Sequence, residues 1–552
     1  MKKQIKKYIF VVGGVMSGVG KGITASSIGK ILQCSGYKVS AVKIDPYVNI
    51  DAGTMNPVEH GETFVLSDGY ETDQDMGNYE RFLNTSLTRD SYMTTGSIYQ
   101  KVINKERSFG YKGKTVSVVP HVPLAVIEQI ENSAKNENAE ITIIEIGGTV
   151  GEYENILFLE AARMMKRQNP DNVAFVLVSY LPIPSAVGEM KTKPTQQAIR
   201  IMQESGIFPD IVVGRADRDI DTPRKVKIAQ ASMLDELDII SAPNMDSVYD
   251  VPGHFITEKL DTRLLNKLHL KKKNNELGKF HTLSWEKFIR STKKQNYTVH
   301  IAVVGKYFDT GDFILSDAYV SVIEALKYAG YYHKTKVHID WLSSHDFENG
   351  SRKITELEKY DGVLIPGGFG NTGIDGKDMV IKYVRENKIP FLGICLGMQR
   401  AAIEFAQSVG KLKHAESDER NIKNSVPLIT TMESQKSKIK NGNMGGSMRL
   451  GSYDAVLKKG TLARKIYKSD IISERHRHRY ELNPEFGELL ESKGVIISGT
   501  SLDGLLPEII ELDKKLHPFF IAVQFHPELQ ARPLDSHPLF NAFIEASFKN
   551  KK

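Results

Sequence analysis

One of the two cysteines stands in a setting that suits a nucleophile. Cys395 lies in Gly393-Ile394-Cys395-Leu396-Gly397, directly after an apolar run and before a helical pattern. Small residues beside a nucleophile permit the tight strand-to-helix turn that exposes its side chain. A helix N-terminus also favours the thiolate form. The spacing predicts a reactive cysteine here, whereas Cys34, on an amphipathic pattern with no base nearby, is predicted to be structural.

A base for this thiol is available in Gln524-Phe525-His526-Pro527-Glu528. The proline favours extended backbone at His526, and residues two apart in extended backbone point the same way. Glu528 can then orient the imidazole while the ring accepts the thiol proton. The glycine-rich loop Pro366–Gly370 could supply oxyanion donors. A lone buried cysteine is more often structural, but these three features in one block favour catalysis.

A second chemical signal lies near the N-terminus, in the loop from Gly13 to Thr24, between an apolar run and a helical pattern. Glycines let backbone N–H groups point at phosphate oxygens, and Lys21 adds charge. The strict pattern G-x-x-x-x-G-K-[ST] is not met, because the first glycine comes one place early and Gly22 replaces the hydroxyl residue. A plain glycine-rich turn is the alternative, which the strand–loop–helix context disfavours.

Two acidic residues are candidates for a magnesium ion bound to a triphosphate. Asp75 follows Glu71-Thr72-Asp73-Gln74, and Glu145 lies near the end of a predicted strand. Mg²⁺ prefers oxygen ligands, and ligands of open α/β sheets gather at the carboxyl ends of strands. Taken alone, either acid could equally be a solvated surface group.

The elements that must position these residues fall into two blocks in which apolar strands alternate with amphipathic helices, as in parallel α/β domains. In the first block we predict strands at Tyr8–Val12, Lys38–Ile44, Glu140–Ile146, Val173–Val178, Ile211–Gly214 and Leu237–Ile240. In the second we predict strands at Thr298–Val304, Lys336–Leu342, Gly362–Ile365, Phe391–Ile394 and Phe519–Phe525, with a helix near Ser316–Tyr328. The polar, lysine-rich stretch between the blocks is the best linker candidate.

Composition is that of an ordinary globular chain. The 552 residues are 41% hydrophobic and 25% charged, with a net charge of +6, which suits anionic small substrates but gives little support for nucleic-acid binding. Two cysteines make no disulfide framework, so we expect a reducing, cytoplasmic location. The lysines before Tyr8 superficially resemble a signal peptide, but the apolar run is short, and no stretch is long enough to cross a membrane.

The second block resembles class I glutamine amidotransferases of the triad type. The first block narrows the family through Asp45-Pro46-Tyr47, Asp51-Ala52-Gly53-Thr54-Met55, His60-Gly61-Glu62, Glu145 to Gly151 and Lys191 to Gln196. With these motifs the chain resembles the CTP synthases over essentially its whole length. The resemblance implies two α/β domains with parallel sheets, a P-loop NTPase-like (dethiobiotin synthetase-like) amidoligase domain and a flavodoxin-like amidotransferase domain. With the polar, lysine-rich stretch taken as a linker at 271–297, the two domains are expected at 1–270 and 298–552.

The resemblance also implies a reaction. ATP phosphorylates O4 of UTP in the amidoligase domain, and ammonia displaces the phosphate to give CTP. Glutamine hydrolysis at Cys395 releases that ammonia, which travels through a closed passage where it stays unprotonated. Implied partners are UTP, ATP and glutamine, with Mg²⁺ as cofactor, CTP as feedback inhibitor, GTP as activator and a homotetrameric assembly, with no nucleic acid and no membrane.

Family roles are carried over residue by residue onto matching positions. The catalytic residues are Cys395, His526 and Glu528. The ATP site comprises Gly18, Val19, Gly20, Lys21, Gly22, Ile23, Asp75, Pro243, Asn244 and Met245. The UTP and CTP site comprises Ser17, Glu152, Tyr153, Glu154, Lys191, Thr192, Lys193, Pro194, Thr195, Gln196 and Lys227. Glutamine is contacted by Gly368, Leu396, Gly397, Met398, Gln399, Glu419 and Arg479, and the metal by Asp75 and Glu145. Lys43 is a plausible second phosphate contact.

Alone, the run Glu474 to Tyr480, rich in arginine and histidine, could be a nucleic-acid patch or a histidine metal site. An arginine fork from Arg479 to the glutamine α-carboxylate explains it better.

Several positions depart from the family pattern. Gly18 stands where serine is frequent, Glu152 where aspartate is common, and Pro243-Asn244-Met245 where the segment is usually more polar. The region Glu433–Asn443 lacks an arginine associated with GTP activation, and Lys438 is nearest to it. These departures concern ATP contacts, CTP inhibition and GTP control rather than the reaction itself.

Two other functions are compatible with part of the pattern. An amidoligase of the cobyrinate amidase type shares the phosphate loop and the glutaminase, but the Lys191–Gln196 and Glu152–Glu154 segments suit a nucleoside triphosphate better. A P-loop switch ATPase with an inert glutaminase-like domain is disfavoured, because such domains usually lack the thiol or the base.

Overall fold

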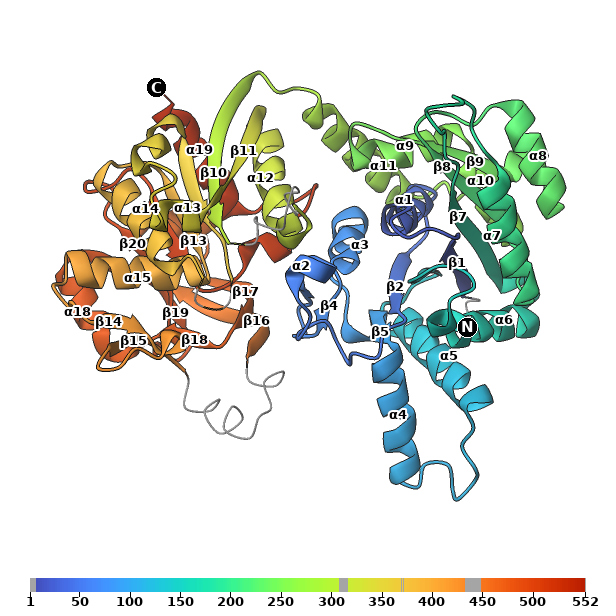
Figure 1. The fold of residues 1–552 in the computed structure, drawn as a ribbon, viewed down its shortest axis with the longest axis horizontal. Coiled ribbons are helices and arrows are strands. Elements are labelled where there is room, and N and C mark those ends of the chain that lie inside the picture. Colours follow the sequence, from blue (N-terminus) through green and yellow to red (C-terminus); the bar gives the residue numbers. More distant parts are fainter. Residues whose placement is uncertain (1–5, 307–315, 369, 371, 432–447, 552) are drawn as a thin grey trace. The chain divides into compact units, whose positions relative to one another are not determined.

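The computed structural model describes residues 6–306, 316–368, 370, 372–431 and 448–551 (Figure 1). The chain separates into two compact units. Unit 1 comprises Met1–Ala52 with Asp75–Ile289, and unit 2 comprises Gly53–Gln74 with Arg290–Lys552. Among the helices in the described ranges, none has the length and apolarity needed to cross a membrane.

A seven-stranded parallel sheet forms the centre of unit 1. Its strands, in spatial order, are β5 (Tyr92–Thr94), β2 (Val39–Asp45), β6 (Ile141–Ile146), β1 (Lys7–Gly13), β7 (Val173–Tyr180), β8 (Ile211–Ala216) and β9 (Ile239–Pro243). Each strand predicted in the first block overlaps one of these, and the short edge strand β5 was not predicted. Parallel pairing places every strand's carboxyl end at one edge of the sheet.

The central strands are apolar throughout because both faces of the sheet are covered. In β1, Phe10 and Val12 belong to the core cluster on one face, while Ile9 and Val11, which alternate with them, are buried on the other. The flanking helices are α1 (Lys21–Cys34), α3 (Asp75–Leu83), α4 (Thr95–Arg107), α5 (Val118–Asn136), α6 (Ile156–Gln168), α7 (Lys193–Glu204), α8 (Thr222–Ser232), α9 (Val251–Thr257) and α10 (Leu260–Lys267).

A nine-stranded sheet forms the centre of unit 2, within the described residues. Its order is β11 (Thr335–Ser343), β10 (Tyr297–Gly305), β12 (Gly362–Ile365), β13 (Phe391–Ile394), β21 (Phe520–Val523), β20 (Pro507–Leu512), β19 (Val495–Ser501), β16 (Arg449–Leu457) and β17 (Ile471–His478). The first five strands are parallel and include all those predicted in the second block. The sheet then continues antiparallel from β21 to β17, an extension that was not predicted.

Smaller elements complete unit 2. Its helices are α2 (Pro57–His60), α12 (Val320–Tyr332), α13 (Ser344–Glu348), α14 (Ile374–Glu386), α15 (Leu396–Ser408), α17 (Leu462–Tyr467), α18 (Gly487–Ser492) and α19 (Pro538–Asn550). A small sheet contains β14 (Ala415–Ser417), β15 (Val426–Thr431) and β18 (Tyr480–Leu482), and another contains β3 (Phe64–Val65) and β4 (Glu71–Thr72).

Two features differ from the expected domain layout. The segment expected to be a linker contains α11 (Glu276–Thr292), whose Trp285 and Phe288 are buried. The segment Gly53–Gln74, which precedes most of unit 1 in sequence, belongs to unit 2. Its β3–β4 hairpin is tied to β17 by Arg475, which donates to the carbonyl oxygen of Val65 at 3.1 Å.

Candidate active sites

Cys395 occupies a sharp turn between β13 and α15, as the sequence predicted. Its backbone has φ 52° and ψ −103°, a conformation that is strained for a residue with a side chain. The turn requires Gly397, because a Cβ there would lie 2.4 Å from the carbonyl oxygen of Ile365. The neighbouring strand therefore dictates the small residue that follows the nucleophile.

His526 and Glu528 are placed by the turn that follows β21. The imidazole Nδ1 lies 2.7 Å from Glu528 Oε1, and both side chains are largely buried. The imidazole also interacts with the Cys395 side chain, and both residues line the same cavity. The three predicted catalytic residues thus converge.

Electrostatics favour a charged imidazole at this position. Burial lowers the pKa of His526, but Glu528 and then Cys395 outweigh it and raise the pKa to about 10. An imidazolium beside the sulfur stabilises the thiolate, and the proton it carries is available for a leaving group. This arrangement suits amide hydrolysis through a thioester.

The cysteine opens into a cavity of about 70 Å³ whose walls come from distant parts of the chain. Gly367 and Gly368 contribute backbone from the loop after β12, as expected for oxyanion donors. Phe369, in the same loop, is outside the described residues. Pro57, Glu62 and Thr63 line the opposite side and were not predicted as site residues.

Glu62 is held in place by the start of α12. Its carboxylate accepts a hydrogen bond from the Ser321 backbone N–H at 3.1 Å and another from the Ser321 hydroxyl at 2.5 Å. A carboxylate at a helix N-terminus satisfies an otherwise unpaired donor. Nothing in the spacing of the sequence indicates this contact, because it joins residues more than 250 positions apart.

The arginine that lines the cysteine cavity is Arg477. Its Nε donates to Glu71 Oε1 at 2.8 Å, and both side chains are mostly buried. Arg479, predicted to contact glutamine, lies two residues later just beyond β17 and is half-buried. The predicted Glu419 accepts a hydrogen bond from the Gly370 N–H at 2.9 Å and so borders the oxyanion loop.

Buried amides and histidines surround the nucleophile. Gln399 donates to the carbonyl oxygen of Tyr480 at 2.8 Å, while Gln524 approaches Cys395 Sγ at 3.7 Å. Burial holds the pKa of His476 and His478 well below the usual value, so both are neutral. In the described ranges no group of three or more His, Cys, Asp or Glu side chains is arranged to hold a metal.

The phosphate loop of unit 1 has the predicted strand–loop–helix form, between β1 and α1. Ser17 and Gly18 are exposed, and Lys21 Nζ donates to the carbonyl oxygen of Gly148 at 2.8 Å. Burial lowers the pKa of Lys21, and Glu145 opposes this shift. Lys21 is therefore held in the loop, close to the carboxyl end of β6.

Lys43, Asp75 and Glu145 form a buried ionic cluster at the same edge of the sheet. Lys43 Nζ lies 2.5 Å from Asp75 Oδ2 and 3.1 Å from Glu145 Oε1. Burial raises the pKa of Glu145. Burial acts in the same sense on Asp75, but Lys43 outweighs it and lowers the pKa of Asp75. The two predicted metal ligands, Asp75 and Glu145, therefore both face the ammonium group of Lys43.

Gly22 explains why the hydroxyl residue of the strict phosphate-loop pattern is missing. A Cβ at this position would lie 2.1 Å from Asp75 Oδ1. Asp75 takes the space that a serine or threonine side chain would occupy. In this chain a carboxylate from α3, rather than a hydroxyl from α1, is thus presented beside the loop.

A cavity of about 100 Å³ lies beside the phosphate loop. It contains the predicted Gly20, Ile23, Pro243 and Met245. Predicted Asn244 accepts a hydrogen bond from Arg215, which also lines the cavity, at 3.0 Å. Further lining residues that were not predicted are Thr24, Ala242, Val248, Val251, His254 and Phe255. A flat apolar ring would fit between them.

The residues predicted to bind the pyrimidine nucleotide occupy several elements. Glu152 accepts hydrogen bonds from the N–H and hydroxyl of Thr149, next to Gly148. Thr195 is buried against Ser179, whereas Lys191 pairs with Glu189 at 2.7 Å. The remaining ones are Tyr153, Glu154, Thr192, Lys193, Pro194, Gln196 and Lys227, of which Tyr153, Glu154, Lys193 and Lys227 are exposed.

We expect Glu528→Gln to slow alkylation of Cys395 by iodoacetamide at pH 7 by about tenfold or more. Each unit by which the pKa of His526 falls lowers the equilibrium constant for forming the thiolate–imidazolium pair about tenfold. Burial lowers the pKa of His526, and the substitution removes the largest of the interactions that raise it, so the imidazolium that stabilises the thiolate becomes less favourable. Peptide mass spectrometry separates Cys395 from Cys34. Glu491→Gln removes an exposed carboxylate and serves as control; equal rates in both variants would contradict the assignment.

Two family models match successive parts of the chain. The family model described as CTP synthase N-terminus matches residues 7–270, and the model described as glutamine amidotransferase class-I matches residues 314–546. The solved glutaminase domain of Trypanosoma brucei CTPS with bound acivicin is 35% identical, with a TM-score of 0.42 over 46% of this chain and 94% of that one.

Whole-length relatives are also found. The chain is 46% identical to the CTP synthase of Caldanaerobacter subterraneus subsp. tengcongensis, covering 99% of both chains. It is 46% identical to that of Carboxydothermus hydrogenoformans and to that of Methanococcus aeolicus, again over 99% of each chain. Full-length identity at this level, together with the converged catalytic residues, shows that the chain belongs to the CTP synthase family.

Proposed function

We propose that this chain converts UTP to CTP, using ATP to activate the uracil ring and glutamine or ammonia as nitrogen donor. Family membership gives the reaction. The observation that carries the proposal is the intact glutaminase centre, in which Glu528 lies 2.7 Å from His526 beside the strained Cys395. An inert glutaminase-like domain would not need this strained turn or the buried ion pair.

In unit 2, the thiolate of Cys395 attacks the side-chain amide carbon of glutamine. Backbone N–H groups of the loop at Gly367 and Gly368 stabilise the oxyanion, where one donor is typically worth about 3 kcal/mol. His526 transfers its proton to the departing nitrogen, and water then hydrolyses the thioester to release glutamate. Arg479 and Glu419 are the proposed contacts of the amino acid head of the substrate, and Arg477 adds positive charge to the cavity wall.

In unit 1, Lys21 and the N–H groups of the phosphate loop hold the triphosphate of ATP. The neighbouring cavity accepts the adenine. Lys191 and Lys193, with Glu152 at the adjoining turn, are the proposed contacts of UTP. After the γ-phosphoryl group moves to O4 of UTP, ammonia attacks C4 and phosphate leaves, so the new C–N bond replaces a C–O bond. A closed passage that keeps ammonia out of water preserves its lone pair.

The residues at the phosphate loop also fit a magnesium ion. Asp75 and Glu145 offer oxygen donors that converge on one cationic group, the ammonium of Lys43. When bound there, Mg²⁺ would neutralise charge on the β- and γ-phosphates. Lys43 and Lys21 bring positive charge to the same place, and Tyr79 donates a hydrogen bond that orients Glu145.

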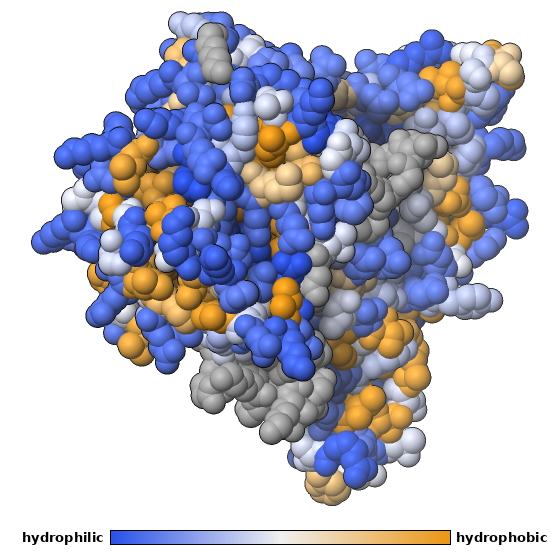
Figure 2. Space-filling view, turned by 60° about the vertical axis from the view of Figure 1, so that its left-hand side comes forward, coloured by the Kyte–Doolittle hydropathy of each residue, from blue (hydrophilic) through white to orange (hydrophobic). Residues whose placement is uncertain are grey.

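Assembly and regulation are further parts of the proposal. The α4–α5 hairpin exposes Ile103, Phe109, Val118, Val119 and Leu124, each more than 40% accessible. Figure 2 shows apolar side chains gathered along this hairpin, the lowest projection in the view. Such a patch on a charged chain suits a subunit contact, in line with a homotetramer.

CTP is expected at a site that overlaps that of UTP, and GTP as an activator. The segment around Lys438, to which GTP control was related, is outside the described residues. A cytoplasmic location remains a prediction from the cysteine content.

The decisive experiment separates the two nitrogen donors. Purified chain with UTP, ATP and Mg²⁺ should form CTP with either glutamine or ammonium, as followed by nucleotide chromatography. Cys395→Ala should lose the glutamine-dependent reaction and retain the ammonia-dependent one, because the thiol serves only glutamine hydrolysis. Cys34→Ala is the matched control and should keep both. A chain that leaves UTP unaminated with both donors is not a CTP synthase, and ATP hydrolysis triggered by a corrinoid acid would favour the cobyrinate alternative.

Asp75→Asn should strongly slow CTP formation with either donor while glutamine hydrolysis continues. The change removes a negative charge from the cluster around Lys43, and catalysis should fall by about a hundredfold or more, as when a charged transition-state contact is lost. Mg²⁺ titration of the residual activity should show weaker dependence on the ion. Asp171→Asn, at an exposed carboxylate of the same unit, should behave as the unaltered chain; normal CTP synthesis by Asp75→Asn would refute the assignment.

The hairpin assignment predicts that Phe109→Ser with Val118→Ser weakens self-association. Losing two apolar side chains at a contact should raise the dissociation constant about tenfold or more. Sedimentation velocity across a concentration series measures the change. Phe208→Ser removes an equally exposed ring elsewhere in unit 1. If the hairpin variant shows the same distribution of sedimentation coefficients as the Phe208→Ser control and the unaltered chain, the subunit contact lies elsewhere.

A further inference from the structure

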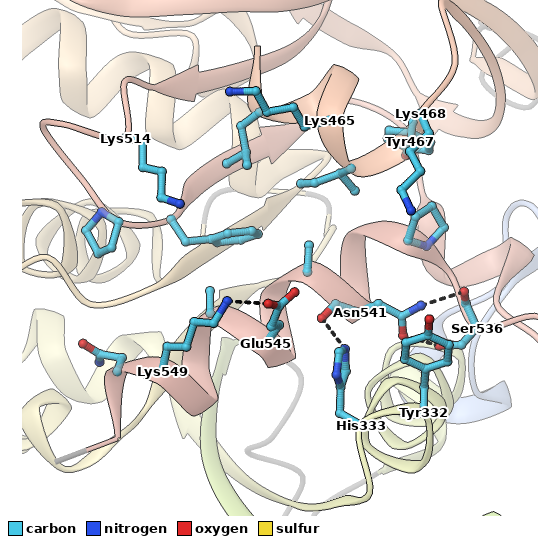
Figure 3. A pocket seen from close by; sticks show the side chains of 18 of the residues that line it. Tyr332, His333, Lys465, Tyr467, Lys468, Lys514, Ser536, Asn541, Glu545 and Lys549 are labelled. Carbon is cyan, nitrogen blue, oxygen red and sulfur yellow. Dashed lines mark hydrogen bonds and ion pairs between the residues drawn. The ribbon is translucent and has the colours of Figure 1, made fainter. Parts of the chain in front are cut away.

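A large cavity in the described residues lies away from both active sites. It has a volume of about 750 Å³ and lies in unit 2 between α17, α19, the end of α12 and the turn from β20 to β21 (Figure 3). None of its lining residues belongs to the cavity around Cys395. Its size matches that of pockets for small organic ligands.

The floor of this cavity is apolar. One side of α19 contributes Ala542 and Ala546, the segment before β21 contributes Pro518 and Phe519, and α17 contributes Leu462. Small side chains on the helix leave its surface open to a flat group. Tyr332, at the end of α12, exposes 68% of its surface at the rim and offers an aromatic face.

Four lysines from three elements surround this floor, against two carboxylates, Asp535 and Glu545. Lys549 already pairs with Glu545, so its charge is neutralised locally. The other three are Lys465, Lys468 and Lys514, all exposed. In the described part of the chain, no carboxylate lies within ion-pair distance of their ammonium groups. Figure 3 shows Lys468 and Lys514 pointing toward the floor from opposite sides.

Three further polar residues of the lining, Asn541, Ser536 and His333, are already hydrogen-bonded within the protein. Asn541 and Ser536 bond to each other at 2.6 and 3.0 Å, and His333 Nε2 lies 3.0 Å from the carbonyl oxygen of Asn541. Burial lowers the pKa of His333, so the ring is neutral and adds no charge. The exposed lysines are therefore the positively charged groups that this cavity offers to a ligand, beside the apolar floor.

We propose that this cavity is a binding site for an organic phosphate, distinct from the sites of ATP, UTP and glutamine. Its phosphate groups contact Lys468 and Lys514, and its ring-containing body lies on α19 against Ala542 and Ala546. Lysine ammonium groups bind phosphate as point charges and tolerate varied geometry. Two such groups on opposite sides suit a ligand with separated negative oxygens, and the apolar floor offers additional contact to a ring.

Pyridoxal 5′-phosphate is a suitable probe because it joins a phosphate ester to an aromatic ring. Its aldehyde condenses with a lysine amine, with loss of water, and borohydride reduces the imine to a stable adduct. The full-length chain is treated briefly and the adducts are located by peptide mass spectrometry. Lys413, Lys423 and Lys493 are exposed lysines of the same unit outside the cavity and provide the reference rate.

We expect Lys468 and Lys514 to react about tenfold faster than the reference lysines, the gain from one charge-assisted contact to phosphate. Pyridoxal, which lacks the phosphate, should show no such preference, and inorganic pyrophosphate should protect both lysines. Uniform labelling, equal preference with pyridoxal, or failure of pyrophosphate to protect would each overturn the proposal.

Variants provide an independent measurement. Lys468→Ala with Lys514→Ala should remove one equivalent of reversibly bound pyridoxal phosphate, measured by equilibrium dialysis. Lys413→Ala with Lys493→Ala removes the same charge outside the cavity and should bind as the unaltered chain does. Retained glutamine hydrolysis shows that each variant is folded. Unchanged stoichiometry in the cavity variant would contradict the site.

Discussion

The buried contact of Lys43 with Asp75 and Glu145 is the interaction on which the nucleotide-binding unit depends. It joins β2, β6 and the start of α3, and an uncompensated charge at this depth would cost several kcal/mol. It also determines the phosphate loop, because Asp75 occupies the space next to Gly22. The phosphate loop, the two carboxylates and Lys43 therefore depend on one another. The position of Asp75 explains why the loop departs from the strict P-loop pattern at Gly22.

Unit 2 solves a different problem with a comparable constraint. A single residue, Cys395, is held at φ 52° by a strand and a helix that approach too closely for any side chain at Gly397. Rigid packing on both sides sustains this strain and presents the sulfur to His526. The imidazole keeps its charge only because Glu528 and Cys395 outweigh the effect of burial. Geometry and charge at this centre are thus set by the same few contacts.

Local spacing was sufficient to predict the nucleophile, its base, the phosphate loop and the parallel strands. Each of these features depends on residues within one turn or one apolar run, so the interactions that determine it are local in the sequence. Contacts between distant segments could not be obtained this way. Spacing does not indicate that Glu62 caps α12 or that Arg477 lies in the cysteine cavity. The antiparallel strands from β20 to β17 are separated by turns and by the short helices α17 and α18, not by the long amphipathic helices that mark parallel units. The cavity with Lys468 and Lys514 is likewise lined by segments that are distant from one another in the sequence.

The placement of Gly53–Gln74 in unit 2 bears on how this enzyme can be divided and how its variants are interpreted. A fragment that starts at the sequence boundary near 298 would leave Arg477 without Glu71 and the first turn of α12 without Glu62. Because Glu62 and Glu71 lie in the first part of the sequence, the effects of substituting them would be attributed to the nucleotide-binding unit. Their physical effect would instead fall on the thiol centre. A glutaminase fragment that keeps these contacts must therefore include residues 53–74, for instance joined to the rest of unit 2 by a short loop.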